Sequence, residues 1–338
     1  MKAVGFYEYL PIDHPESLLD VEIPLPVPAG RDLLVEVRAV SVNPVDTKRR
    51  AAGTRPSTEL KILGWDAAGV VAATGPQAQL FKPGDKVYYA GSNQRAGANS
   101  QLHLVDERIV GPKPTNLSFA EAAALPLTTI TAWEAMFERM GISKSGADTG
   151  KRLLILGGAG GVGSIAIQLA KKLARLKVIA SASRADSLAW VRTLGADATV
   201  DHTQPLPDQM IALGVPEVDY LFCCNNTEQV FPMLPRLIAP QGRICSIVRM
   251  AKPVDLSLLQ EKSASFSWEG MFTRSTFQTP DMQAQHELLE DAAGLLEAGA
   301  LATTLRDNMG KICAANLKLA HQRIEQGHVI GKLVLEGF

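Results

Sequence analysis

The sequence predicts a two-domain α/β protein in which a β-rich region precedes a doubly wound parallel sheet. Three observations support this fold class. The chain has 338 residues, 46% of them hydrophobic, so it is too long for one ordinary domain and apolar enough for substantial cores. Its first third contains short β-type runs separated by Pro and Gly. From about Ser118, strand-like and helix-like segments alternate, which is typical of a parallel sheet.

In the first region, the runs LLVEVRAVSV (33–42) and AAGVVAATG (67–75) predict antiparallel strands. The segment PGDKV (83–87) predicts a tight reversal, since Pro fixes φ ahead of a Gly that tolerates positive φ. Ser118 and Glu121 have the spacing of a capping box, so a helix is expected to begin after Ser118.

The second region alternates predicted strands with helical stretches, the pattern of a doubly wound sheet. The strands are expected at 152–158, 177–183, 198–201, 218–224 and 242–248. SASFSWEGMF (263–272) predicts one more strand, followed by a helix over 281–299 and a closing strand, GKLVLEG. This tail is too short to be a domain by itself, so we expect it to pack on the first one. The predicted boundaries are 1–125, 126–271 and 272–338.

Charge and composition exclude several classes of partner. The 34 Lys and Arg residues nearly balance the 35 Asp and Glu residues, so no global field draws the chain to nucleic acid or anionic lipid. No secretory apolar region occurs at the N-terminus, and no apolar run approaches the roughly 20 residues that cross a bilayer. We therefore expect a cytoplasmic protein. The four cysteines lack the paired spacing of a zinc site and are expected to be reduced thiols.

A glycine-rich turn is the strongest chemical signal. Gly158, Gly160 and Gly163 form G-x-G-x-x-G between an apolar strand and an amphipathic helix, with Gly161 and Val162 in the same predicted site. Gly158 is expected to permit the tight turn, Gly160 to let a pyrophosphate approach, and Gly163 to allow close packing. The helix N-terminus then favours phosphate, so the sequence predicts a dinucleotide site.

The end of the second predicted strand indicates which dinucleotide is bound. An NAD site places an acid there to bind both ribose hydroxyls, but this chain has Ser183 and Arg184. A hydroxyl and a guanidinium can instead bind a 2′-phosphate. NADPH is therefore the predicted cofactor, although Arg184 could simply be a solvated residue that opens the next helix.

Taken together, AVSVNPVD (39–46), LGWDAAGVV (63–71), PGDKV and GGAGGVGSIAIQLA resemble the medium-chain dehydrogenase/reductase superfamily over essentially the whole chain. The order and spacing are closest to the quinone oxidoreductase and enone or alkenal reductase branches, including the zinc-type alcohol dehydrogenase-like subgroup. The resemblance implies a GroES-like catalytic domain, a Rossmann domain and an active site between them.

The same resemblance predicts that no catalytic zinc is bound. Motif matching puts Asn43, Trp65 and about Leu127 where the zinc enzymes have their three ligands, and none is a suitable ligand. Asp66 replaces the Glu of the zinc motif, but one carboxylate cannot hold a catalytic zinc. No cysteine precedes Cys223, so the lobe with four structural cysteines is also missing.

Without a metal, a conjugated enone, enal or quinone is the expected acceptor, because donors can stabilise the charge that spreads onto its oxygen. Lys48 is the first candidate catalytic residue, and plant enone reductases resemble this chain in having lysine there. Its ammonium could bind the nicotinamide ribose or the substrate oxygen, or Lys48 could be a surface lysine. Asn43 could donate to the substrate carbonyl or cap the local turn, and Asp46 is expected to orient Lys48 or backbone groups.

Three further residues complete the predicted site. Trp65 and Tyr88 are expected to shape an apolar substrate pocket, although burial as core aromatics is an equal alternative. The resemblance places Thr131 near the nicotinamide.

The edge strand at 263–272 predicts a homodimer. A zinc-dependent alcohol dehydrogenase and a non-catalytic NADPH-binding protein remain the alternative functions.

Overall fold

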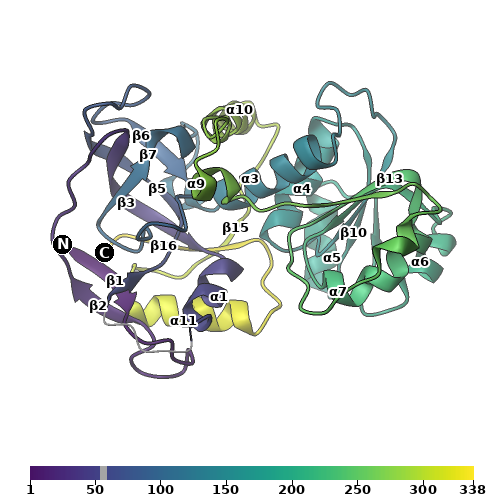
Figure 1. The fold of residues 1–338 in the computed structure, drawn as a ribbon, viewed down its shortest axis with the longest axis horizontal. Helices are drawn as coiled ribbons and strands as arrows, with labels where there is room; N and C mark the ends of the chain where they lie inside the picture. The colour runs from purple at the N-terminus through teal and green to yellow at the C-terminus, as the bar shows by residue number, and fades with distance from the viewer. Residues whose placement is uncertain (54–58) are drawn as a thin grey trace. The chain divides into compact units, whose positions relative to one another are not determined.

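Residues 1–53 and 59–338 are described by the computed structural model, in which they form two units. One unit comprises residues 1–130 and 272–338, and the other comprises residues 131–271 (Figure 1). No helix among these described residues has the length and apolar character needed to cross a membrane.

The first unit is built on a sheet of seven described strands with the order β15-β16-β3-β5-β6-β8, in which β7 also pairs with β3. In β3, Asp32–Val42, buried and more exposed residues alternate over the first eight positions, as expected of a strand with one face on the core. A second sheet has the order β2-β1-β4. The other strands are β1 Lys2–Phe6, β2 Leu19–Glu22, β4 Lys61–Ile62, β5 Asp66–Thr74, β6 Lys86–Tyr89, β7 Leu102–Asp106, β8 Val110–Pro112, β15 Leu305–Asn308 and β16 Lys332–Glu336.

Two local predictions are confirmed in this unit. Gly84 in the PGDKV turn has a φ of +96°, the left-handed conformation that glycine tolerates. Ser118 caps α2, Phe119–Ala123, through a hydrogen bond of 3.2 Å that its hydroxyl accepts from the Glu121 N–H. The Glu121 carboxylate in turn accepts from the Ser118 N–H at 2.8 Å, which completes the capping box.

The C-terminal segment returns to the first unit. Strand β16 pairs antiparallel with β3, and α10, Ala284–Glu297, packs against β8. Helix α11, Ala314–Glu325, lies beside α1, Pro44–Ala51 (Figure 1). The closing strand of the sequence is therefore part of the same sheet as the residues that lead into α1. The remaining helices of these segments are α3 Pro126–Trp133, which runs into the second unit, and α9 Thr273–Phe277.

The second unit is a six-stranded parallel sheet with the order β11-β10-β9-β12-β13-β14. Numbered from its first strand, this order is 3-2-1-4-5-6, the Rossmann arrangement, so the predicted doubly wound sheet is confirmed. The strands are β9 Arg152–Leu156, β10 Lys177–Ser181, β11 Ala198–Val200, β12 Val218–Cys223, β13 Ile238–Ser246 and β14 Ser265–Trp268. The helices are α4 Gly161–Lys172, α5 Ala185–Thr193, α6 Leu206–Ala212, α7 Thr227–Val230 and α8 Leu234–Leu237, with a π-helix at Glu134–Arg139.

One strand of this sheet begins earlier than predicted. Strand β13 begins at Ile238, whereas the sequence predicts a strand that begins at Gly242. A register shift between Val218 and Tyr220 of β12 lets Ile238 pair before the Pro-Gln-Gly segment, which sequence patterns treat as a break.

Candidate active site

The glycine-rich turn lies between β9 and α4, where the order of the parallel strands changes direction. Such a topological switch point is where open α/β sheets bind their ligands. A Cβ placed on Gly163 would lie 2.4 Å from the Gly157 carbonyl oxygen, so only glycine lets the helix approach the turn this closely. A Cβ on Gly160 would meet only the Gly157 oxygen, at 3.6 Å, which leaves space over the backbone for a pyrophosphate.

The role predicted for Gly158 is wrong in one respect. The left-handed residue of the turn is Gly157, with a φ of +85°, and not Gly158. Gly158 serves close packing instead, because a Cβ there would lie 2.8 Å from the Ala180 Cβ of the neighbouring strand. The G-x-G-x-x-G spacing does not distinguish the two adjacent glycines.

The first turn of α4 presents backbone N–H groups to this space. Gly160 is the N-cap, and Gly161, Val162 and Gly163 follow it as the first helical residues. The first N–H groups of a helix have no acceptor within the helix, and they carry the positive end of its dipole. These residues fit the phosphates of a dinucleotide.

Ser183 and Arg184 follow the end of β10. This strand neighbours β9, the strand that leads into the glycine-rich turn. Both are half-buried, and Arg184 is the N-cap of α5. Its guanidinium lies 3.3 Å from the exposed carboxylate of Asp186, and its backbone N–H donates to the Ser187 hydroxyl at 3.1 Å. The structure therefore places a serine and an arginine at the strand end where NAD-specific sites have an acid.

Thr131, the other predicted cofactor residue, is a buried residue of α3.

Two buried cysteines of the second unit, Cys223 and Cys245, are not activated nucleophiles. Burial raises the pKa of the Cys223 and Cys245 thiols to about 12, so both are protonated at neutral pH.

In the first unit, Asn43 and Asp46 are buried at the junction of β3 and α1. The Asp46 carboxylate accepts hydrogen bonds from the backbone N–H groups of Asn43, at 2.6 Å, and Gly64, at 3.1 Å. Burial raises the pKa of Asp46 to about 7, whereas these two donors oppose the shift. Asp46 thus holds two backbone segments together.

The Asn43 side chain takes part in a buried network that no local sequence pattern predicts. Its amide nitrogen donates to Asp66 Oδ2 at 2.8 Å, and its amide oxygen accepts from the ammonium of Lys332. Lys332 also forms an ion pair of 3.1 Å with Asp66. Burial raises the pKa of Asp66, and the Lys332 ammonium opposes that shift. The network uses both ends of the Asn43 amide.

Lys48 lies on α1, and its side chain is exposed. The next residues, Arg49 and Arg50, differ in their surroundings. Arg49 is exposed, whereas Arg50 is buried and bonded to Glu325 of α11. Lys48 therefore combines a fixed helical backbone with a side chain that is accessible to a ligand.

Trp65 and Tyr88 are both buried core aromatics. The Trp65 indole N–H donates to the Ser92 carbonyl at 3.0 Å, and its ring packs edge to face on Phe272, with centroids 5.7 Å apart. The Tyr88 hydroxyl donates to the Leu289 carbonyl at 2.6 Å, which ties β6 to α10. Their polar atoms are thus engaged within the protein.

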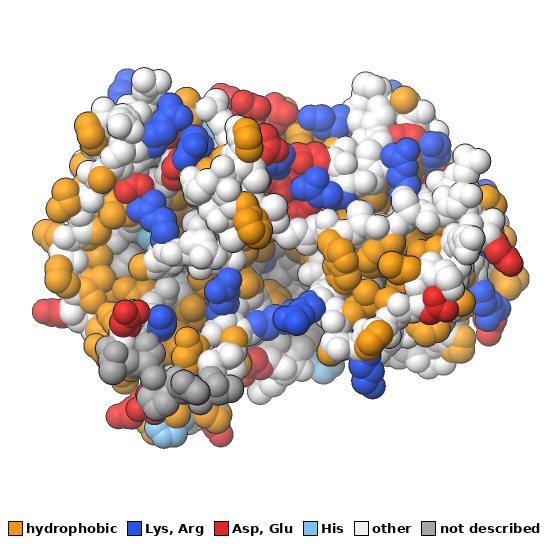
Figure 2. All heavy atoms as spheres, viewed as in Figure 1, with side chains coloured by type: hydrophobic (Ala, Val, Ile, Leu, Met, Phe, Trp, Pro, Cys, Tyr) orange, Lys and Arg blue, Asp and Glu red, His pale blue; other side chains and the backbone are white. Residues whose placement is uncertain are grey.

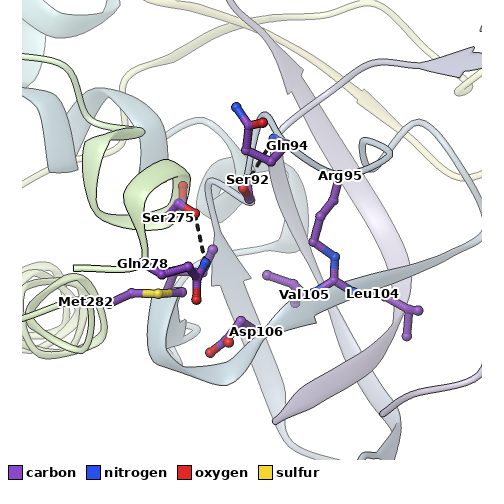
Figure 3. A pocket seen from close by; sticks show the side chains of 10 residues that line it. Ser92, Gln94, Arg95, Leu104, Val105, Asp106, Ser275, Gln278 and Met282 are labelled. Carbon is purple, nitrogen blue, oxygen red and sulfur yellow. Dashed lines mark hydrogen bonds between the residues drawn. The ribbon is translucent and has the colours of Figure 1, made fainter. Parts of the chain in front are cut away.

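The loop 91–100 contributes to a small pocket of about 170 Å³ in the first unit (Figure 3). Ser92, Gln94 and Arg95 of this loop face Ser275 and Gln278, which are joined by a hydrogen bond of 2.9 Å between the Gln278 amide and the Ser275 carbonyl. None of the predicted catalytic residues is among the lining residues described for this pocket.

Both units match known protein families. Residues 29–133 match the alcohol dehydrogenase GroES-like domain, and residues 161–291 match the zinc-binding dehydrogenase family. A zinc-type alcohol dehydrogenase-like protein of Staphylococcus epidermidis is 41% identical over 337 residues, 99% of each chain. A Rhizobium etli structure, described as a candidate zinc-dependent alcohol dehydrogenase, is 50% identical with a TM-score of 0.95, covering 100% of this chain and 98% of that one.

A third relative is the NADPH-dependent alkenal/one oxidoreductase of Arabidopsis thaliana. It is 33% identical over 260 residues, covering 72% of this chain and 63% of the relative. The Rossmann unit with its glycine-rich turn, and the family matches to both units, define a nicotinamide-dependent oxidoreductase. The chain belongs to the medium-chain dehydrogenase/reductase superfamily, in the group of zinc-type alcohol dehydrogenase-like proteins.

The residues present do not fit the zinc that these family names imply. At the matched positions, the Trp65 indole donates to a carbonyl, the Leu127 side chain has no donor atom, and Asn43 is bonded to a lysine. The described residues contain no group of three or more His, Cys, Asp and Glu that could hold a metal ion. The donor set is therefore unsuited to zinc, which prefers thiolate, imidazole and carboxylate.

Proposed function

We propose that this protein is an NADPH-dependent reductase that transfers hydride to a conjugated acceptor, an enone, an enal or a quinone, without a catalytic metal. One observation carries the proposal. Of the positions that match zinc ligands, Asn43 and the Leu127 N–H are hydrogen-bonded to Asp66, Asn43 also bonds to Lys332, and Trp65 donates to the Ser92 carbonyl. An unactivated ketone needs a strong electrophile to stabilise the alkoxide, whereas a conjugated acceptor spreads the charge and needs only hydrogen-bond donors.

The cofactor part of the proposal rests on the second unit. The N–H groups of Gly161, Val162 and Gly163 would bind the pyrophosphate, and Ser183 and Arg184 would bind the 2′-phosphate. When bound, NADPH supplies the hydride. The NADPH-dependent Arabidopsis relative supports this preference.

The substrate part of the proposal rests on Lys48. Its exposed ammonium is a donor that would stabilise negative charge on the acceptor oxygen. Asn43 and Asp46 would act by holding the start of α1, since their side chains are bonded within the protein. Trp65 and Tyr88, as buried core aromatics, would support the residues that form the substrate pocket.

A panel assay tests the function. Purified protein should oxidise NADPH only when an alkenal, an enone or a quinone is added, and a saturated ketone of similar size should give little rate. Binding of NADPH without turnover of any acceptor would favour a non-catalytic NADPH-binding protein. A preference for the saturated ketone or its alcohol would favour an alcohol dehydrogenase.

A further inference from the structure

Three oxygen atoms surround the buried ammonium of Lys332. Its Nζ donates to Asp66 Oδ2 at 3.1 Å, to the Val42 carbonyl at 3.1 Å, and to the Asn43 amide oxygen. Lys332 is 3% exposed and Asp66 is fully buried. A buried ammonium needs an acceptor for each of its three N–H groups, and this set provides them.

Lys332 is far in the sequence from the residues that supply these oxygen atoms, by 266 positions from Asp66 and 289 from Asn43. Val42 ends β3, Asn43 precedes α1, Asp66 opens β5, and Lys332 opens β16. The other oxygen of Asp66 accepts from the Leu127 N–H at 2.7 Å. Asn43 and Leu127, which motif matching aligns with two zinc-ligand positions of zinc alcohol dehydrogenases, therefore both bond to the carboxylate that holds the ammonium.

We propose that Lys332 is an internal cation that takes the place of a metal ion among Asn43, Asp66 and Val42, and that it excludes metal from this site. Carboxylate, amide and backbone carbonyl oxygens are the ligands that hard cations prefer. A metal ion and the ammonium need the same acceptors, so they cannot be held together. The inference concerns cation binding and does not rest on the proposed reductase activity.

Lys332→Ala is the direct test, because it keeps Cβ and removes the part of the side chain that propylammonium replaces. The variant leaves the Asp66 carboxylate buried without its cation, so its Tm should fall well below that of the wild type. Propylammonium or Mn²⁺ should then raise the Tm of the variant progressively with concentration, as a ligand that binds the folded state does. Tetramethylammonium, which has no N–H group, should not. Neither propylammonium nor Mn²⁺ should raise the Tm of the wild type beyond the effect of salt.

Lys113→Ala is the matched control. Lys113 is also buried, but its ammonium donates to the backbone carbonyls of Pro114 and Leu117 and not to a carboxylate. This control should lose stability without responding to Mn²⁺. The double variant Lys332→Ala with Asp66→Asn should lose the Mn²⁺ response of the single variant, because the negative ligand is gone.

Two outcomes would overturn the proposal. One is a folded Lys332→Ala variant that responds to neither cation. The other is a wild type that binds Mn²⁺ in a way that Asp66→Asn abolishes. If Lys332→Ala does not fold alone, refolding is measured with and without propylammonium. Recovery supports the proposal, and equal failure in both conditions contradicts it.

Discussion

The Ser181 hydroxyl at the end of β10 accepts a hydrogen bond of 2.9 Å from the backbone N–H of Gly157. Ser181 is buried, and Gly157 is the left-handed residue of the glycine-rich turn. The bond therefore joins one parallel strand to the turn that follows its neighbour. It also helps to fix the backbone from which α4 begins.

Ser181→Ala should weaken binding of NADPH and NADH by similar factors, because both cofactors share the pyrophosphate that this turn supports. One hydrogen bond is worth about 1 kcal/mol, so the dissociation constants should rise up to about fivefold. Fluorescence titration with each cofactor measures this. Unchanged affinity for both would show that the turn holds its shape without Ser181.

Wild-type protein should bind NADPH more tightly than NADH, and Ser183→Asp should reverse the preference by repelling the 2′-phosphate. Arg184→Ala should weaken NADPH about 10- to 100-fold, the range for a charge-assisted hydrogen bond, and leave NADH nearly unaffected. Arg192→Ala on the same helix is the control, since Arg192 bonds to Thr199. A wild-type preference for NADH would refute the assignment of this strand end.

Lys48→Ala should reduce turnover of an enone or a quinone about 100- to 1000-fold with little change in Tm, the cost of losing one preorganised donor. If Lys48 holds only the cofactor ribose, the NADPH affinity falls instead. Arg49→Ala, the exposed neighbour, serves as the control. Chelators should change none of these rates. A chelator-sensitive wild type would contradict the metal-free mechanism, and an unaltered Lys48 variant would remove Lys48 from the site.

Acidification should destabilise the protein through His321, which is fully buried on α11. Burial, with a smaller effect of the nearby Arg50 guanidinium, lowers the pKa of His321 from 6.5 to about 3. The folded state therefore excludes a proton that the unfolded state binds below pH 6.5. This residue should cost about 1.4 kcal/mol of stability per pH unit as the pH falls from 6.5 toward 3.

Urea unfolding at pH 7 and pH 5 tests this effect. His321→Leu should lose less stability on acidification than the wild type does, because a leucine side chain takes up no proton in either state. His202→Gln, at an exposed histidine, should keep the wild-type dependence. The same pH dependence in wild type and His321→Leu would show that His321 is not the group that titrates.

We also predict a homodimer formed through β14, the edge strand of the parallel sheet. Trp268 on this strand is 48% exposed, and Figure 2 shows hydrophobic side chains gathered over part of the second unit. Light scattering should give twice the chain mass of 36.3 kDa, and Trp268→Lys should shift the protein toward monomer. Leu213 follows α6, which packs against β11 at the opposite edge of the sheet. The control variant Leu213→Lys should therefore leave the dimer intact. A wild type that is monomeric at micromolar concentration would refute the prediction.

The parallel sheet could be predicted because its strands are continuous apolar runs separated by helical stretches, a local pattern. The glycine-rich turn was recognisable for the same reason, although spacing alone could not show that Gly157 is the left-handed residue. The Lys332 network had no local signal. Its two charged partners are 266 positions apart, and a lysine at the start of a strand ordinarily faces solvent.

The burial of Tyr88 was equally hard to predict in detail, because the Leu289 carbonyl that accepts its hydroxyl is 201 positions away. Periodicity shows which face of a strand is apolar but not which distant element covers it. The surroundings of a residue could therefore be predicted where its neighbours belong to the same continuous segment, and not where they come from a distant one.

The pairing of β16 with β3 has a consequence for synthesis of the chain. Residues 131–271 form one unbroken segment, whereas the other unit needs strands from both sides of it. A ribosome releases the five N-terminal strands of the seven-stranded sheet long before it has translated Lys332 or the strand that this lysine opens. The Rossmann unit can therefore fold first, and Asp66 has no ammonium partner until translation reaches β16. During that interval the uncompleted sheet is the part of the nascent protein that most needs protection from aggregation.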